Sequence, residues 1–262
     1  MKNKIETPTI IDFWSGNRSL ARQEYEREIL FALLKVTEEE YGKCLIKENT
    51  AEYPGKMESL AFSEQNHDVL VSVAGNKKFE NTKAIIIPIP ILKNILGQRV
   101  LIIREDDKKQ FEKIKERQSI QALRLGIPET WSDADIFRHN EFNVVENGNF
   151  DDIFKRLQNK EFDYLSFGAN EVLGIFKNKT TNLKGLMIDD NILLSYRFPL
   201  YFYVHPDKYK LAKRIEIGLK KLLSSGELDQ IFDAFYGKIK EQLHLDKRRT
   251  FVLHNPLLPE KF

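Results

Sequence analysis

The chain has 262 residues, and its 41 Lys and Arg residues nearly balance its 39 Asp and Glu residues, for a formal net charge of +2. This balance argues against the basic surface by which proteins bind nucleic acid. Cys44 is the only cysteine, which excludes an intramolecular disulfide and a cluster of thiolate metal ligands. With 42% hydrophobic residues, the chain can bury the core of one large domain or two modest ones.

The sequence contains no run that approaches the roughly 20 apolar residues of a membrane-spanning helix. Its first residues, Met1-Lys2-Asn3-Lys4-Ile5-Glu6, lead into Thr7-Pro8 without the apolar segment of a signal peptide. We therefore expect either a cytoplasmic protein or a mature exported protein from which the signal peptide has been removed.

The N-terminal part of the chain alternates between apolar strands and amphipathic helices. The strand at residues 9–14 ends at the turn Ser15-Gly16-Asn17, and apolar residues recur at helical spacing over residues 20–37. Pro54-Gly55 opens a further helix. The other strands predicted in this part lie at residues 43–46, 68–73, 84–90 and 100–103. This alternation favours a mainly parallel sheet with covering helices.

A charged stretch at residues 104–117 separates this part from a second set of elements. The pattern there predicts strands at residues 121–127, 143–145 and 163–167, and helices at residues 134–139 and 150–157. A third region begins with a strand at residues 199–204 and continues with two helices that start near Asp207 and Leu228. Gly237 ends the second of these helices, and we expect an extended tail after it.

A chain that builds one α/β lobe, leaves it for a second and then returns must cross between the lobes twice. We place these crossings near residues 104–107 and 190–196. Residues 1–105 and 194–262 then form a discontinuous first lobe, and residues 106–193 form the second. Two crossing strands make a hinge, and a cleft above a hinge is a natural ligand site.

Several short segments stand at the ends of these predicted elements. They are Pro54-Gly55 before Asp68-Val69-Leu70-Val71, then Leu96-Gly97-Gln98-Arg99-Val100, Thr130-Trp131-Ser132-Asp133, Gly168-Ala169-Asn170-Glu171, Arg197-Phe198-Pro199-Leu200 and Ser225-Gly226-Glu227-Leu228. In this order they resemble the periplasmic solute-binding proteins of ABC importers, specifically the family that contains the polar amino-acid receptors.

The resemblance implies an α/β, two-lobed periplasmic-binding-protein type II fold with two crossover hinge strands and a ligand cleft between the lobes. It also implies a monomeric receptor without cofactor, bound metal or catalytic activity. Such a receptor, in the periplasm or outside the cell, captures an amino acid or related organic acid by hinge closure and delivers it to a membrane permease. Two features depart from the family pattern. Gly75-Asn76-Lys77-Lys78 stands where the receptors have Thr-x-x-Arg, and the acid after the second-lobe strand is Glu171 rather than Asp.

The first candidate ligand site is the turn that precedes the predicted helix at residues 134–139. Backbone N–H groups at a helix N-terminus are unpaired and favour an anion such as a carboxylate. The hydroxyl groups of Thr130 and Ser132 add donors. The alternative is that Ser132 or Asp133 only caps the helix.

Aromatic and charged residues complete the candidate site. Trp131 in a polar turn and Trp14 at the end of the first strand are candidates to stack on a ligand, although each ring is equally suited to core packing. Glu171 is a candidate partner for a ligand ammonium group, and its alternative role is an acidic residue that stabilises a helix N-terminus.

Three cationic side chains are further candidates for the ligand site. Arg99 and Arg197 lie beside the proposed crossings, where an arginine either binds a ligand carboxylate or forms a structural ion pair. Lys78 is a weaker candidate for contact with a charged ligand, and an ordinary loop lysine is the alternative.

Catalytic motifs are missing from the sequence. The histidines have no metal-ligand spacing, and there is no nucleophile elbow, P-loop or dinucleotide fingerprint. The same fold nevertheless hosts lyases, so a dehydratase of the cyclohexadienyl type with Glu171 as acid/base is one alternative. A sensory or accessory domain that has lost its ligand and contacts a protein partner is the other.

Overall fold

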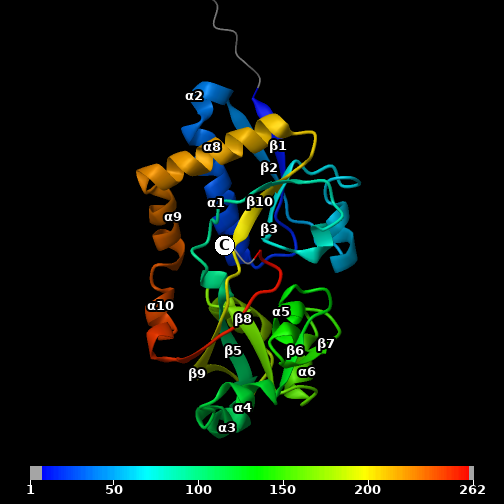
Figure 1. The fold of residues 1–262 in the computed structure, drawn as a ribbon, viewed down its shortest axis with the longest axis vertical. Coiled ribbons are helices and arrows are strands. Elements are labelled where there is room, and N and C mark those ends of the chain that lie inside the picture. Colours follow the sequence, from blue (N-terminus) through cyan, green and yellow to red (C-terminus); the bar gives the residue numbers. More distant parts are fainter. Residues whose placement is uncertain (1–7, 260–262) are drawn as a thin grey trace, which may run out of the picture. The chain divides into compact units, whose positions relative to one another are not determined.

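The computed structural model describes residues 8–259, which form two compact units. The first unit contains the described residues up to Ile91 together with Leu200–Phe235, and the second contains Leu92–Pro199 together with the residues from Tyr236 onward (Figure 1). Each unit has its own mixed β-sheet with helices packed on it. The predicted α/β class is confirmed.

The first unit is built on a five-stranded sheet. Its strands are β1 (Thr9–Trp14), β2 (Cys44–Asn49), β3 (Val69–Val73), β4 (Ile85–Ile87) and β10 (Leu200–Val204). The order across the sheet is β2-β1-β3-β10-β4, with β1 parallel to β2 and β3, and β10 antiparallel to β3 and β4. Because β1 and β3 are neighbours and end at the same edge, the loops after them can bring distant side chains together.

Helices α1 and α8 pack closely together in this unit (Figure 1). The helices here are α1 (Leu20–Val36), α2 (Glu38–Tyr41), α8 (Tyr209–Ser225) and most of α9 (Glu227–Tyr236). A Cβ at Gly218 of α8 would lie 2.8 Å from Leu33 Cβ of α1, so this close packing requires glycine. The buried Arg214 donates hydrogen bonds to Thr37 Oγ1 (2.9 Å) and Leu34 O (2.8 Å), which satisfies groups at the end of α1. The helix predicted at Pro54-Gly55 is a 3₁₀ helix over Gly55–Leu60.

The second unit is built on a six-stranded sheet in the order β11-β9-β5-β8-β6-β7. Its strands are β5 (Gln98–Arg104), β6 (Arg124–Ile127), β7 (Asn143–Glu146), β8 (Tyr164–Gly168), β9 (Leu186–Ser195) and β11 (Arg249–Val252). Its helices are α3 (Lys108–Glu112), α4 (Arg117–Gln121), α5 (Asp133–His139), α6 (Ile153–Gln158), α7 (Val172–Lys179) and α10 (Ile239–Gln242). Strand β8 is buried along its whole length, as expected for an apolar strand in the interior of a covered sheet.

The observed units differ from the predicted lobes at their boundaries. The chain passes from the first unit to the second after Ile91, returns after Pro199 and passes to the second again after Phe235. The first two crossings therefore lie outside the predicted positions, residues 104–107 and 190–196, because β5 and β9 pair with each other within one sheet. The third crossing was not expected. Residues 1–7 and 260–262, which the prediction assigned to the first lobe, lie outside the described residues.

The C-terminal segment is not simply an extended tail. It forms α10 and then β11, which pairs in parallel with β9 from Arg249↔Ile192 to Val252↔Ser195. The buried Arg248 anchors this segment by donating to Ile192 O at 3.2 Å and to Leu243 O at 2.8 Å. The pairing therefore places the segment in the second unit instead of the first.

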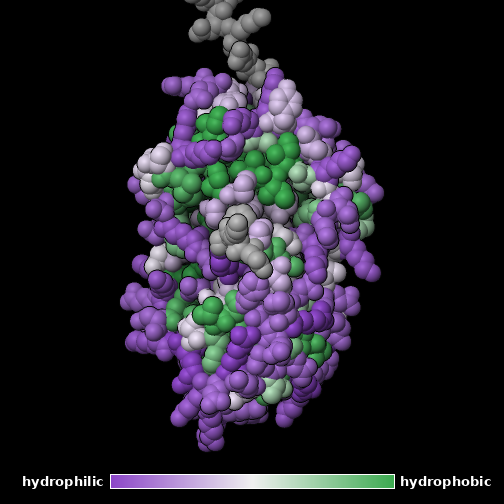
Figure 2. Space-filling view, in the orientation of Figure 1, coloured by the Kyte–Doolittle hydropathy of each residue, from purple (hydrophilic) through white to green (hydrophobic). Residues whose placement is uncertain are grey.

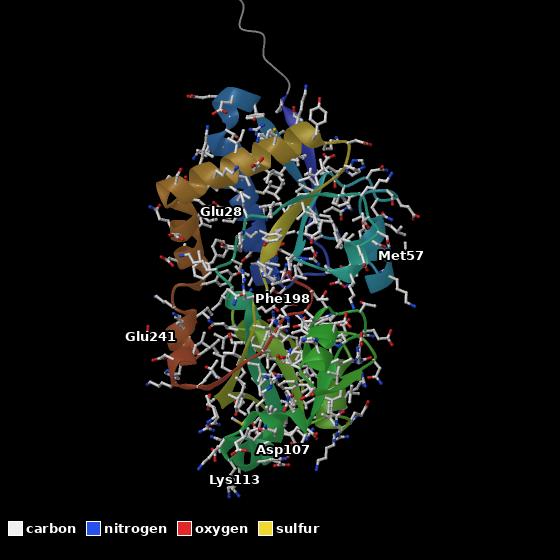
Figure 3. All side chains as sticks on the ribbon, viewed as in Figure 1. Glu28, Met57, Asp107, Lys113, Phe198 and Glu241 are labelled. Atoms are coloured by element: carbon white, nitrogen blue, oxygen red, sulfur yellow. The ribbon has the colours of Figure 1, made fainter. Side chains whose placement is uncertain are left out.

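Hydrogen bonds join the first two crossing segments within each unit. In the first unit, Ile91 N–H donates to Leu200 O at 3.2 Å. In the second, Asn94 Nδ2 donates to Tyr196 O at 3.1 Å, while Asn94 Oδ1 accepts from the N–H of Phe198 at 2.7 Å. Phe198, labelled in Figure 3, is buried. The two segments are thus held side by side just before and just after the crossings.

Figure 2 shows a largely hydrophilic face that separate apolar patches interrupt. Among the described residues, no helix combines the length and the apolar character needed to cross a membrane. Residues 8–259 also contain no group of three or more His, Cys, Asp or Glu side chains placed to hold a metal ion.

Candidate functional site

The predicted ligand-binding residues are divided between the two units. Trp14 and Lys78 lie in the first unit. The others lie in the second unit: Arg99, Thr130, Trp131, Ser132, Glu171 and Arg197. Each group is described within its own unit below.

Trp14 lies at the end of β1 and is only 1% exposed. Its Nε1–H donates to Ala51 O at 2.9 Å, and its ring stacks on Tyr53 with the ring centroids 5.2 Å apart. The guanidinium carbon of Arg18 lies 5.2 Å from the Trp14 ring centroid. Trp14 therefore belongs to the core, and Tyr53, which is only half-buried, is the ring of this stack that reaches the surface.

Tyr53 is held at its backbone and at its hydroxyl group. Asn17 Nδ2 donates to Tyr53 O at 2.6 Å, and Tyr53 N–H donates to Asn17 Oδ1 at 2.9 Å. The Tyr53 hydroxyl lies 3.1 Å from His67 Nε2. Asn17 has φ 56°, a left-handed conformation that asparagine tolerates better than most residues. The loop that carries Tyr53 is thus held by hydrogen bonds although it has no regular secondary structure.

His67 in turn contacts Asp12 of β1, with 2.6 Å between Nδ1 and the carboxylate Oδ1. The other carboxylate oxygen of Asp12 accepts from Lys47 Nζ at 3.0 Å. Burial alone would raise the pKa of Asp12, but the hydrogen bonds from His67 and Lys47 outweigh it, and the pKa is lowered. His67 was not predicted as a site residue, because the five histidines are scattered along the chain without a shared spacing. The one local signal was its place directly before a buried strand.

An Asp12→Asn variant should be less stable than the wild type by about 1–3 kcal/mol at neutral pH, because His67 loses a charged partner. The native pKa of Asp12 is lowered, so its contribution is complete above the unfolded value of about 4 and is lost as pH falls through the lower native pKa. Urea unfolding from pH 7 to about pH 3 should therefore show the difference between variant and wild type shrinking in acid. Asp207→Asn, at a side chain 89% exposed beside His205, is the matched control. A difference that stays constant with pH would contradict this assignment.

Lys78 forms an ion pair with Glu58, with 2.9 Å between Nζ and Oε1. Both side chains are largely buried, Glu58 at 7% exposure and Lys78 at 16%. Glu58 Oε1 also accepts from Asn17 Nδ2 at 2.8 Å, so Asn17 connects this ion pair to Tyr53. The charge of Lys78 is thus balanced inside the first unit. Lys78 and Trp14 are thus linked through Glu58, Asn17 and Tyr53, by an ion pair, hydrogen bonds and a ring stack.

In the second unit, Arg99 of β5 is buried and forms an ion pair with Asp133, with 2.9 Å between Nη2 and Oδ1. The same guanidinium donates to Ser166 O at 2.9 Å and to Leu96 O at 3.2 Å. The Tyr196 hydroxyl donates to Asp133 Oδ1 at 2.5 Å. Arg99 is therefore used in a structural ion pair, one of the two roles that the sequence left open.

The charges around Arg99 keep it ionised. Burial lowers the pKa of the guanidinium, but the nearby Asp133, Tyr196 and Glu171 raise it, and the net shift is upward. Burial raises the pKa of Tyr196 well above its ordinary value, so the phenol stays protonated. Glu171 is half-buried at the N-cap of α7. This helix-terminal position is the structural role that the sequence allowed for Glu171.

The turn before α5 carries Thr130, Trp131 and Ser132, all half-buried. Thr130 has φ 69°, and its N–H donates to Glu146 Oε1 at 3.1 Å. Ser132 occupies the N-cap of α5, but its side chain forms no capping hydrogen bond. The Trp131 ring packs on Phe150, with 5.9 Å between centroids. Trp131 is thus the partly exposed member of an aromatic cluster.

Two further observations concern the second unit. Arg197 is exposed, and its carbonyl oxygen accepts from Asn255 Nδ2 at 2.8 Å.

Asn170, next to Glu171, was not predicted as a site residue. It is 4% exposed, and neither atom of its side-chain amide has a hydrogen-bond partner among the described residues. A buried amide of this kind is costly unless a water molecule or a ligand satisfies it.

No family model matches the sequence, and no curated protein is significantly similar to it. Solved structures do resemble it. A probable amino-acid ABC transporter extracellular-binding protein from Bacillus subtilis has a TM-score of 0.63 and 14% identity, and the match covers 88% of this chain and 99% of that one. An ancestral arginine-binding protein bound to glutamine has a TM-score of 0.61 and 12% identity, with 88% and 99% covered. A periplasmic binding protein of Salmonella typhimurium with high arginine specificity has a TM-score of 0.61 and 12% identity, with 87% and 99% covered. The chain therefore has the type II periplasmic-binding-protein fold.

Proposed function

We propose that this chain is an extracytoplasmic receptor that captures a small polar ligand, an amino acid or a related organic acid, for an ABC transporter. The observation that carries the proposal is the extent of the structural similarity. It covers 88% of this chain and 99% of an ancestral arginine-binding protein. The similar structures include proteins bound to glutamine and to arginine. Delivery to a membrane permease, hinge closure and a monomeric state remain predictions.

Each unit offers its own candidate contacts. In the first unit, Tyr53, supported by Trp14, provides a partly exposed ring on which a ligand can stack, and in the second unit Trp131 is such a ring. Glu171, a half-buried residue, is the candidate carboxylate for an ammonium group. Arg197 is the exposed cation of the predicted set and suits a ligand carboxylate better than Arg99 does, since Asp133 already balances Arg99. Thr130 and Ser132 are further candidates for polar contacts, whereas Lys78, like Arg99, is already paired with a carboxylate.

A panel of the common amino acids and organic acids should include at least one compound that raises the melting temperature of the protein. A ligand at about one hundred times its Kd stabilises the native state by about 2.7 kcal/mol, which corresponds to a shift of about 5 °C or more. Differential scanning fluorimetry measures the shift. Glu171→Gln should reduce it for ligands with an ammonium group, whereas Glu112→Gln, at an exposed residue of α3, should not. A panel without any shift would count against a receptor and in favour of an accessory domain that has lost its ligand.

A lyase on the same fold is the second candidate, because Glu171 and Arg99 are close enough for the carboxylate to raise the arginine pKa. Turnover of prephenate or arogenate by the wild type, abolished in Glu171→Gln, would establish it. A wild type that shows thermal shifts with amino acids but turns over neither compound is a receptor.

A further inference from the structure

We propose that Asp12 and His67 form a hydrogen-bond relay that fixes the phenolic oxygen of Tyr53 as a hydrogen-bond acceptor. The ligand group that Tyr53 recognises is then a donor, an N–H or an ammonium group. This inference rests on the proposed function: it applies only if the chain binds a small polar ligand, and it names one chemical group of that ligand.

The relay consists of two short contacts in a buried place. His67 Nδ1 lies 2.6 Å from Asp12 Oδ1, and His67 Nε2 lies 3.1 Å from the Tyr53 hydroxyl. The His67 side chain is 2% exposed, so bulk water does not compete for either ring nitrogen. Three distant segments supply the three groups: β1, the loop after β2, and the residue two positions before β3.

The chemistry of the partners determines the direction of each hydrogen bond. An ionised carboxylate only accepts, so Nδ1 of His67 carries the proton that is shared with Asp12. In the neutral imidazole, Nε2 then has a lone pair and no hydrogen, and it accepts from the Tyr53 O–H. The hydroxyl hydrogen is thereby used, and the lone pairs of the phenolic oxygen remain to accept from a ligand.

Charged neighbours stabilise the ionised form of Asp12. Lys47 Nζ lies 3.0 Å from Asp12 Oδ2. Asp68 Oδ2 accepts from the backbone N–H of Asp12 at 3.0 Å, while Asp68 Oδ1 pairs with Lys208 at 2.9 Å. The other nearby cation, Arg18, lies over the Trp14 ring. Each of the two carboxylates therefore has its own lysine, and the proton on Nδ1 keeps an ionised acceptor.

Hydrogen bonds and a stacked ring hold Tyr53 in this arrangement. Asn17 holds its backbone through two hydrogen bonds, of 2.6 and 2.9 Å, and Trp14 stacks on its ring. A side chain placed in advance loses little entropy when a ligand binds. A proton on Nε2 would reverse the relay, because His67 would then donate to Tyr53 and release its O–H as a donor.

The decisive measurement is the tautomer of His67 in the ligand-free, full-length protein. Long-range ¹H–¹⁵N NMR correlations distinguish protonated from unprotonated ring nitrogens, and the spectrum of a His67→Asn variant identifies the His67 signals among those of the five histidines. We expect a protonated Nδ1 and an unprotonated Nε2 at neutral pH. A protonated Nε2, in either the other tautomer or the imidazolium form, would overturn the proposal.

The second measurement is binding of L-arginine and L-glutamine by calorimetry. Tyr53→Phe keeps the stacked ring but removes the acceptor, and it should weaken binding of the amino acid that binds by about tenfold. His67→Asn added to Tyr53→Phe should cause no further loss, because His67 acts through the hydroxyl. Tyr209→Phe, at a residue 65% exposed, is the control and should bind like the wild type.

The two measurements separate the two proposals. If the losses of binding free energy from Tyr53→Phe and from His67→Asn add up in the double variant, the relay is overturned. This holds even if the NMR tautomer of His67 is as expected. A wild type that binds neither amino acid nor any other member of the ligand panel contradicts the receptor function, whereas the NMR result still decides the direction of the relay.

Discussion

Asp133→Asn should lower the free energy of unfolding of the second unit by about 3–5 kcal/mol, since it removes the ion-pair partner of the buried Arg99. Arg99 is 1% exposed, and Asp133 is the carboxylate within ion-pair distance of it. The amide is nearly isosteric with the carboxylate, so the loss is one of charge and not of packing. The neighbouring Tyr196 also loses the ionised acceptor of its hydroxyl group.

The two tryptophans allow this effect to be measured in one unit at a time. Trp14 lies in the first unit and Trp131 in the second, and the sequence contains no other tryptophan. In a Trp14→Phe background, Trp131 fluorescence during urea unfolding reports the second unit. Asp106→Asn, at an exposed residue of the same unit, is the control. An Asp133→Asn variant within about 0.5 kcal/mol of its background would show that Arg99 does not depend on this charge.

Trp14→Ala should destabilise the first unit by about 3–5 kcal/mol, the usual cost of removing a fully buried aromatic side chain. The ring is 1% exposed and packs against Tyr53 and His67, so the deletion leaves a cavity behind the candidate ligand contact. Binding should weaken as well, because Tyr53 loses the ring that supports it.

Circular dichroism reports both units, whereas Trp131 fluorescence reports the second alone. We expect Trp14→Ala to lower the urea concentration at which the first unit unfolds, as circular dichroism reports it. The unfolding transition that Trp131 fluorescence reports should stay unchanged. Trp14→Phe keeps a stacked ring and loses the hydrogen bond to Ala51, so its cost should be about 1 kcal/mol. Equal effects of the alanine and phenylalanine variants would mean that the ring is not packed as described.

Local patterns predicted most of the elements. The strand at residues 9–14 and the helix at residues 20–37 appear as β1 and α1 within a residue of the expected bounds, because an apolar run before a turn and a helical repeat are local properties. The strand β11 was missed for the opposite reason. Residues Arg249–Val252 are not buried, and their pairing with β9 connects positions more than fifty residues apart.

The residues of the candidate site also divide into those that a local pattern reveals and those that only distant contacts reveal. Trp14, Trp131, Glu171 and the turn before α5 stand out in the sequence because a polar turn or an aromatic ring at the end of a strand is visible locally. Their partners do not stand out. Asp12 and His67 are 55 positions apart, and Asn17 and Tyr53 are 36 apart, so no spacing rule connects them.

The sequence by itself determined the α/β class, the order of most strands and helices, and a resemblance to solute-binding receptors, since all three follow from short-range patterns of apolar and turn residues. Only the tertiary structure decided that Arg99 is balanced by Asp133, that the C-terminal segment joins the second sheet, and that Tyr53 and not Trp14 reaches the surface of its stack. These outcomes depend on which distant side chains share a buried space, because burial makes an unpaired charge or polar group costly and so selects its partner.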